Sequence, residues 1–249
     1  MFTAPSVLLL HGVQSSRTTW WQASADLAEL GWQVVALDLP GHGGRTEAST
    51  SGDWIDDLAT DILAQCAGRG PFDLVVGHSL GAIVALAAAA REPGLARGVL
   101  IEDPPGLGAG GVDVQVVADE IERDVAAARR DPAARVDAVL AENPLWSRGD
   151  AQQSVANCLS LDTDAVVRAL RASLWDLPDL VRGCPVPVQL LAAPPATSAV
   201  TGVDRDALLS LLPADRVAIV VSGHAIHRDR PALWLHTVLR FADTLSGPA

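Results

Sequence analysis

The chain has 249 residues and is 49% hydrophobic, which is enough to bury a large core and fits one α/β domain with an inserted segment. Its formal net charge of −12 argues against a nucleic-acid or anionic-membrane surface, since either requires basic patches. The three cysteines have neither paired nor metal-ligand spacing, and no basic segment precedes a long apolar run near the N-terminus. We therefore expect a cytoplasmic protein with reduced thiols and no membrane contact.

Strand-length apolar runs alternate with helical patterns along the chain. Helical patterns cover residues 19–30, 54–67 and 82–91, between apolar runs that lack a polar face. Runs that are apolar on both faces and are linked by helices predict an α/β fold with a mainly parallel sheet, covered by helices on each side. The predicted strands are residues 6–10, 33–37, 72–76, 98–101, 186–191 and 216–221.

Residues 104–184 interrupt this alternation. A glycine-rich linker at 106–111 opens the interval, and amphipathic helical patterns follow it without any strand pattern. About eighty residues of this kind between two core strands predict a helical cap domain rather than a loop. The predicted organisation is a core of residues 1–103 and 185–249 with a cap of residues 104–184, and an apolar cap helix could support a homodimer. The predicted cap helices are residues 114–130, 133–142, 151–159 and 164–174.

The run Gly77-His78-Ser79-Leu80-Gly81 lies between an apolar strand and an alanine-rich helix. A serine on such a tight strand-to-helix turn presents its hydroxyl away from the backbone, and glycines allow the turn because they have no Cβ to clash. Ser79 is therefore the candidate nucleophile. Its hydroxyl needs a base, an acid and oxyanion donors from elsewhere in the chain.

These features together resemble the α/β-hydrolase fold over nearly the whole chain, because an N-terminal strand followed by His11-Gly12, the serine turn, a cap and a late histidine occur in that order. The resemblance implies that the backbone N–H groups of Val13 and Leu80 form the oxyanion hole. It also implies that His224, in a Gly-His pair after the last predicted strand, is the base. His227 is the competing histidine, and we expect it to make a structural hydrogen bond instead.

The position of the candidate catalytic acid in this sequence departs from the commonest pattern of these enzymes. Most members place an aspartate just beyond the strand at 186–191, where this chain has Pro194 and no carboxylate. Haloalkane dehalogenases and fungal zearalenone lactonases, which the chain resembles in this respect, carry the acid at the end of the preceding core strand. An ungapped comparison with them places Asp103 on their acid. Glu102 is the second choice, because side chains alternate along a strand and it should face the opposite side. Asp204 and Asp206 are weaker alternatives.

The sequence favours a serine hydrolase that cleaves a carboxylic ester or lactone through an acyl-enzyme, without a metal or cofactor. The apolar cap residues Leu145, Trp146, Leu174 and Trp175 favour a substrate with an apolar acyl or ring part. Carbon–carbon bond hydrolysis and a cofactor-free lyase or cyclase activity are the alternatives, because one fold supports all of them. Glu120, on the first cap helix, is expected on a solvated face.

Overall fold

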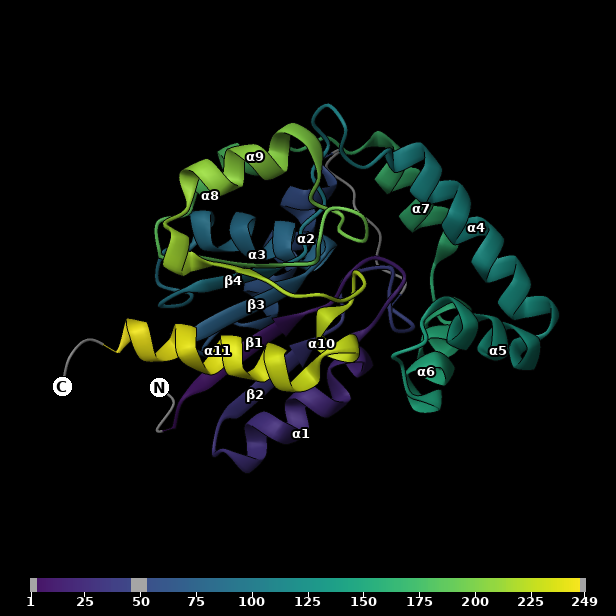
Figure 1. Ribbon diagram of the computed structural model, residues 1–249, viewed down its shortest axis with the longest axis horizontal. Coiled ribbons are helices and arrows are strands. Elements are labelled where there is room, and N and C mark those ends of the chain that lie inside the picture. The colour runs from purple at the N-terminus through teal and green to yellow at the C-terminus, as the bar shows by residue number, and fades with distance from the viewer. Residues whose placement is uncertain (1–3, 46–52, 247–249) are drawn as a thin grey trace.

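The computed structural model describes residues 4–45 and 53–246. Six parallel strands form one sheet in the order β2-β1-β3-β4-β5-β6, with helices on both faces (Figure 1). This confirms the predicted α/β class and parallel sheet. The strands are β1 (Ser6–Leu10), β2 (Gln33–Leu37), β3 (Leu74–His78), β4 (Val99–Glu102), β5 (Val188–Ala192) and β6 (Val217–Ile219).

The side chains of the strands divide between two hydrophobic cores. In β1, Leu8 and Leu10 belong to one core, and Val7 and Leu9 belong to the other, because successive side chains of a strand point to opposite faces. Helices α2 (Trp54–Gln65) and α3 (Leu80–Arg91) cover the first face. Helices α1 (Trp21–Glu29) and α11 (Pro231–Leu245) cover the second (Figure 1). Burial on both faces explains why the central strands are apolar throughout.

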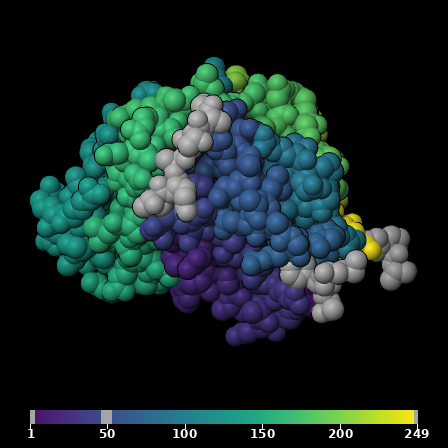
Figure 2. Space-filling view, turned by 180° about the vertical axis from the view of Figure 1, so that it is seen from behind, coloured from purple at the N-terminus to yellow at the C-terminus, as the bar shows by residue number. Residues whose placement is uncertain are grey.

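Four helices between β4 and β5 form a lobe beside the carboxyl ends of the strands (Figure 1). We call α4–α7 the cap lobe. In it α4 packs on α7 and α5 packs on α6. Figure 2 shows the lobe from behind, in teal and green, at one end of the molecule. Its helices are α4 (Val114–Arg130), α5 (Pro132–Glu142), α6 (Arg148–Leu159) and α7 (Thr163–Ala172).

Helix α8 (Leu177–Gly183) falls within the range predicted for the cap but packs on α3 and α9 (Gly202–Leu211), which belong to the core layer. The periodicity of this short segment did not predict a helix. Asp176 caps its N-terminus by accepting from the Asp179 backbone N–H, and a proline follows in the first turn, where proline is tolerated. The predicted division at residues 104–184 remains a prediction.

Two helix boundaries differ from the predicted ones for identifiable local reasons. Helix α6 begins at Arg148, three residues earlier than expected, because Ser147 and Asp150 form a capping box. Helix α3 begins at Leu80 rather than Ala82, because β3 continues to His78 and leaves Ser79 alone as the connection. In the described parts of the chain, no helix combines the length and apolar character needed to cross a membrane.

Candidate active site

Ser79 lies in a strained backbone conformation between β3 and α3. Its φ of 52° and ψ of −121° are outside the regions that side-chain-bearing residues usually adopt. A Cβ at Gly77 would lie 2.2 Å from the Gly81 carbonyl oxygen, and a Cβ at Gly81 would lie 2.3 Å from the Leu10 carbonyl oxygen. The two glycines are therefore required by close backbone packing. The Ser79 hydroxyl makes no hydrogen bond to any described residue, so it is available to a substrate.

The backbone N–H groups of Val13 and Leu80 have no acceptor among the described residues. Leu80 is the first residue of α3, where an N–H group has no partner within the helix. Val13 follows His11-Gly12 at the end of β1, next to β3 in the sheet. Both residues line the same cavity as Ser79. Two unpaired donors beside a serine hydroxyl are the arrangement that an oxyanion hole requires.

Asp103 and His224 form a short hydrogen bond, with 2.6 Å between Asp103 Oδ2 and His224 Nδ1. Asp103 follows β4 directly, is fully buried and has a positive φ of 44°. His224 lies in the loop after β6, and its side chain is 40% exposed. Because the carboxylate accepts the Nδ1 proton, the Nε2 atom is left as the proton acceptor. His224 lines the same cavity as Ser79.

The loop after β5 supplies hydrogen-bond donors to Asp103. The backbone N–H of Ala193 and the hydroxyl of Ser198 donate to Oδ1 over 3.0 and 2.6 Å, and the Ala199 N–H donates to Oδ2 over 2.9 Å. Burial opposes the ionised form of Asp103. The hydrogen bond and charge of His224, together with the hydrogen bonds from Ser198 and Ala199, nevertheless hold the pKa of Asp103 below its usual value. The loop after β5, which lacks the expected aspartate, therefore donates hydrogen bonds to Asp103, the carboxylate that follows β4.

Glu102 points to the opposite side of the sheet, as strand alternation predicts. It is fully buried and accepts three hydrogen bonds of 2.8–2.9 Å, two from His227 and one from the Trp234 indole. Burial raises the pKa of its carboxyl group, whereas the N–H donors favour the carboxylate. No hydrogen bond or ion pair joins Glu102 to His224 in the described structure. The two adjacent carboxyl groups therefore serve different histidines.

A hydrogen-bonded chain holds His227 in the core. Arg228 Nε donates to Thr19 Oγ1 over 3.0 Å, and Thr19 Oγ1 lies 2.9 Å from His227 Nε2. With Glu102 as a carboxylate accepting from Nδ1–H, His227 is a neutral imidazole whose Nε2 accepts the threonine proton. Burial lowers its pKa well below the usual value, in accord with this assignment. The structural role expected for His227 fits these contacts.

Three further histidines are buried and bonded to the backbone. His78 Nε2 donates to the His224 carbonyl over 3.1 Å, while His11 and His42 donate from Nδ1 to the carbonyls of Gly12 and Pro40. Burial lowers the pKa of His78 to about 3, that of His11 to about 4 and that of His42 to about 3. Neutral, fixed rings of this kind organise loops. His224 is the remaining histidine that lines the cavity with Ser79.

His78, Glu102 and His227 lie within ligand distance of one another, a cluster that sequence spacing did not reveal. They come from β3, from β4 and from the short helix α10 (Ile226–Asp229), which precedes α11. Their atoms are already engaged: His227 Nδ1 bonds Glu102, and His78 Nε2 donates to a carbonyl. The arrangement is therefore accounted for as a hydrogen-bonded core, without a metal ion.

Two cavities meet at the candidate residues. The first has a volume of about 310 Å³ and contains Ser79 and His224. The second has a volume of about 220 Å³ and shares Val13, Gln14, His78 and His224 with the first. Apolar side chains of the cap lobe and its flanking segments line much of the first cavity, namely Val112, Val114, Val117, Leu170 and Trp175.

The cap residues expected to form an apolar pocket divide between different environments. Trp175 lines the first cavity and Trp146 lines the second, whereas Leu174 is 87% exposed and Leu145 is 46% exposed. Leu174 follows the end of α7, so it is not held on the inner face of a helix. Glu120 lies on the solvated face expected for it, since its side chain is 58% exposed and its Oε1 lies 3.7 Å from Arg123 Nη2, and it also borders the first cavity.

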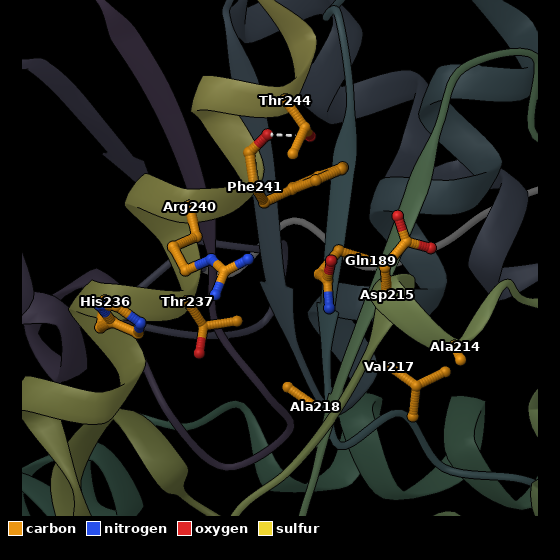
Figure 3. A pocket seen from close by; sticks show the side chains of 10 residues that line it. All are labelled: Gln189, Ala214, Asp215, Val217, Ala218, His236, Thr237, Arg240, Phe241 and Thr244. Carbon is orange, nitrogen blue, oxygen red and sulfur yellow. Dashed lines mark hydrogen bonds between the residues drawn. The ribbon is translucent and has the colours of Figure 1, made fainter.

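A third cavity of about 310 Å³ lies between α11, β5 and β6 (Figure 3). Gln189 at its centre comes from the start of β5, and His236 and Arg240 approach from α11 (Figure 3). None of the candidate catalytic residues lines it. Sites of open parallel sheets form beyond the carboxyl ends of the strands, which is where Ser79 and Asp103 lie.

A family model described as the alpha/beta hydrolase family matches residues 7–236 of the chain. The chain belongs to the alpha/beta hydrolase family. It is 30% identical over 247 residues to a 2-succinyl-6-hydroxy-2,4-cyclohexadiene-1-carboxylate synthase of Klebsiella pneumoniae (strain 342), covering 92% of this chain and 90% of the relative. An esterase of Mycobacterium tuberculosis is 33% identical over 104 residues, covering 41% of this chain and 33% of the relative.

Solved structures share the fold of this alpha/beta hydrolase. The enol-lactonase from Burkholderia xenovorans LB400 matches with a TM-score of 0.73 at 19% identity, covering 97% of this chain and 92% of that one. Membership of the family establishes the fold and the hydrolase superfamily. It does not establish which bond is cleaved, because relatives with the same fold are named as synthases, esterases and lactonases.

In this alpha/beta hydrolase, the later aspartates lie away from the base. Asp204 accepts from the Gly108 backbone N–H over 2.7 Å, and Gly106 and Gly108 pack so closely on it that a Cβ at either would overlap its carboxyl group. Asp204 thus anchors the glycine-rich linker to α9. Asp206 is exposed on the same helix. Neither contacts His224 in the described structure.

Glu102→Ala is expected to destabilise the protein by about 3–5 kcal/mol, because it opens a cavity and leaves the buried N–H groups of His227 and Trp234 without acceptors. The free energy of unfolding from urea titration measures this. Glu29→Ala is the control, since Glu29 is exposed on α1 and should change stability by less than about 0.5 kcal/mol. Equal midpoints for the two variants would contradict the structural role of Glu102.

Proposed function

We propose that the protein is a serine hydrolase that cleaves a carboxylic ester or lactone through an acyl-enzyme. The observation that carries the proposal is the 2.6 Å bond between Asp103 Oδ2 and His224 Nδ1, which leaves Nε2 to accept a proton in the cavity where the Ser79 hydroxyl is unpaired. The proposed catalytic residues are Ser79, His224 and Asp103. The backbone N–H groups of Val13 and Leu80 are the proposed oxyanion donors.

The proposed reaction has two steps. In the first, Ser79 Oγ attacks the carbonyl carbon while His224 Nε2 takes its proton, and Val13 and Leu80 stabilise the oxyanion. His224 then gives the proton to the departing alkoxide, which leaves as an alcohol or as the opened end of a lactone. In the second step, water attacks the acyl-enzyme while His224 takes its proton, and His224 then returns that proton to Ser79 Oγ as the acid product departs. Asp103 orients the imidazole and stabilises the imidazolium without taking the proton.

The electrostatics of the site support this division of roles. Asp103 is buried with four donors around it, and its pKa lies below the usual value, so it is ionised at neutral pH. A fixed negative charge beside Nδ1 favours a proton on the imidazole as the oxyanion forms. The mainly apolar lining of the first cavity supports a substrate with an apolar acyl or ring part.

A fluorophosphonate probe tests the proposal directly. It should label Ser79, detected by peptide mass spectrometry, and the protein should hydrolyse 4-nitrophenyl butanoate with a burst of nitrophenolate. Both results depend on an activated serine hydroxyl. Absence of labelling and of turnover in a folded protein would contradict the proposal.

The second candidate is a carbon–carbon lyase activity, favoured by the similarity over nearly the whole chain to the Klebsiella pneumoniae synthase. In that case the serine would polarise a carbonyl or abstract a proton with His224 and would form no acyl-enzyme. The product named for that relative carries carboxylate groups, which need cationic partners; no arginine lines the first cavity, but Arg228 lines the second. Ester or lactone hydrolysis is the preferred function because the first cavity, where Ser79 lies, has a mainly apolar lining that suits an apolar acyl or ring part.

A further inference from the structure

The second cavity contains a buried cation. Arg228 is 7% exposed and lines this cavity, which lies between the core, helix α6 and the segment that joins α5 to α6. Its Nε donates to Thr19 Oγ1, and its Nη1 donates to the Asp150 carbonyl over 3.3 Å. Its Nη2 atom donates to none of the described residues. The guanidinium therefore offers an unused edge to the space beside His224.

Asp150 does not occupy that unused edge. Its Oδ1 accepts from the Trp21 indole over 2.9 Å, and its Oδ2 accepts from the backbone N–H and hydroxyl of Ser147. The distance from Arg228 Nε to Asp150 Oδ1 is 3.9 Å, which is too long for a hydrogen bond. Asp150 thus helps to keep the arginine charged and leaves Nη2 unpaired.

The remaining charges near Arg228 also leave it cationic. Glu102 and Asp229 favour its charged form, and burial lowers its pKa to about 10, which is still well above neutral pH. The guanidinium carbon lies 4.4 Å from the centre of the Trp146 ring, a stacked contact that holds the group in place. Arg228 is therefore fixed and charged before any substrate binds.

Asn157 on α6 lines the same cavity and carries a second donor without a partner. It is 4% exposed, its Oδ1 accepts from Ser16 Oγ over 2.8 Å, and its Nδ2 has no acceptor among the described residues. A buried amide N–H without a partner costs about 1–3 kcal/mol unless a ligand accepts from it. Two donors, one of them cationic, and no acidic side chain among the residues that line this cavity define a site for an anionic acceptor.

We propose that Arg228 and Asn157 bind a carboxylate group of the substrate in the second cavity. Because this cavity meets the first at Val13 and His224, the preferred substrate carries a carboxylate on one side of the scissile ester or lactone bond and an apolar group on the other. A planar carboxylate fits the fork of a guanidinium better than a neutral acyl group does. This inference rests on the proposed hydrolase function and names its substrate class.

Calorimetric titration with glutarate tests the site without any need for turnover. The wild type should bind glutarate at least tenfold more tightly than glutaramide. Asn157→Asp, which keeps the acceptor for Ser16 and places a negative charge opposite Arg228, should weaken glutarate binding at least tenfold, as should Arg228→Gln. Arg230→Gln is the matched control, because Arg230 lies two residues away, bonds the Val221 carbonyl and lines neither of these two cavities. Its glutarate affinity should equal that of the wild type.

Ester selectivity gives the second measurement, with 4-nitrophenyl hemiglutarate against its methyl ester and 4-acetoxybenzoate against methyl 4-acetoxybenzoate. These pairs place the carboxylate on the acyl or on the leaving side. In the pair whose carboxylate reaches the site, the wild-type kcat/KM should be at least tenfold higher for the ester with the free carboxylate than for its methyl ester, because KM is lower. In Asn157→Asp the ratio of these two kcat/KM values should fall to about one. Equal binding of glutarate and glutaramide, or a preference that survives both cavity variants, would overturn the inference. Glutarate binding without hydrolysis of any ester would instead count against the hydrolase function alone.

Discussion

Ser79→Ala should lower kcat for hydrolysis of 4-nitrophenyl butanoate by about 10⁴-fold or more, because the substitution removes the atom that forms the acyl-enzyme. The stability of the fold should change little. The hydroxyl makes no hydrogen bond to a described residue, so its loss leaves no buried partner unsatisfied. Single-turnover kinetics and the thermal midpoint measure the two effects separately.

Two controls make this result interpretable. Fluorophosphonate labelling should disappear in Ser79→Ala and persist in Ser198→Ala, whose hydroxyl bonds Asp103 and belongs to the loop that holds the acid. Any residual esterase activity of Ser79→Ala should be the same in independently purified preparations, because activity from a contaminating hydrolase would vary between them. A folded Ser79→Ala protein with full activity would contradict the assignment of Ser79 as the nucleophile.

Asp103→Asn should lower kcat by about 10³–10⁴-fold, with a small change in KM, because an amide facing His224 Nδ1 favours the wrong tautomer and no longer stabilises the imidazolium. Steady-state kinetics across neutral pH measure this. Asp204→Asn is the matched control. It is the same substitution at a buried aspartate that bonds Gly108 and not His224, so kcat should stay within about threefold.

The stability of Asp103→Asn should show a defined pH dependence. The native pKa of Asp103 is held below its unfolded value, so its ionisation stabilises the folded state above the unfolded pKa, and this contribution is lost as the pH falls through the native pKa. The stability difference between wild type and variant should therefore be largest near neutral pH and shrink in acid. Urea titrations at several pH values test the sign. A loss of activity in Asp204→Asn with full activity in Asp103→Asn would move the acid to the later helix.

Several features of the fold could be predicted from the sequence because they depend on local pattern. The parallel sheet follows from strands that are apolar on both faces, and the first cap helix has the predicted bounds Val114–Arg130 because Asp113 caps it and its apolar positions keep a helical period. The serine turn was recognisable because Gly77 and Gly81 are needed for backbone contact. Helix α8 was missed because seven residues give too little periodicity to distinguish a helix from a loop.

The sequence by itself determined the candidate nucleophile, the parallel sheet and the preference for Asp103 over Glu102, because these depend on local turn chemistry and strand alternation. Tertiary structure alone decided what Asp103 contacts, since His224 lies 121 positions away and reaches it only when β4 and the loop after β6 are brought together. It also decided that Glu120 lines a cavity and that Arg228 keeps an unpaired edge. Cavities and unused donors arise from how distant elements pack, and no single segment of sequence encodes that arrangement.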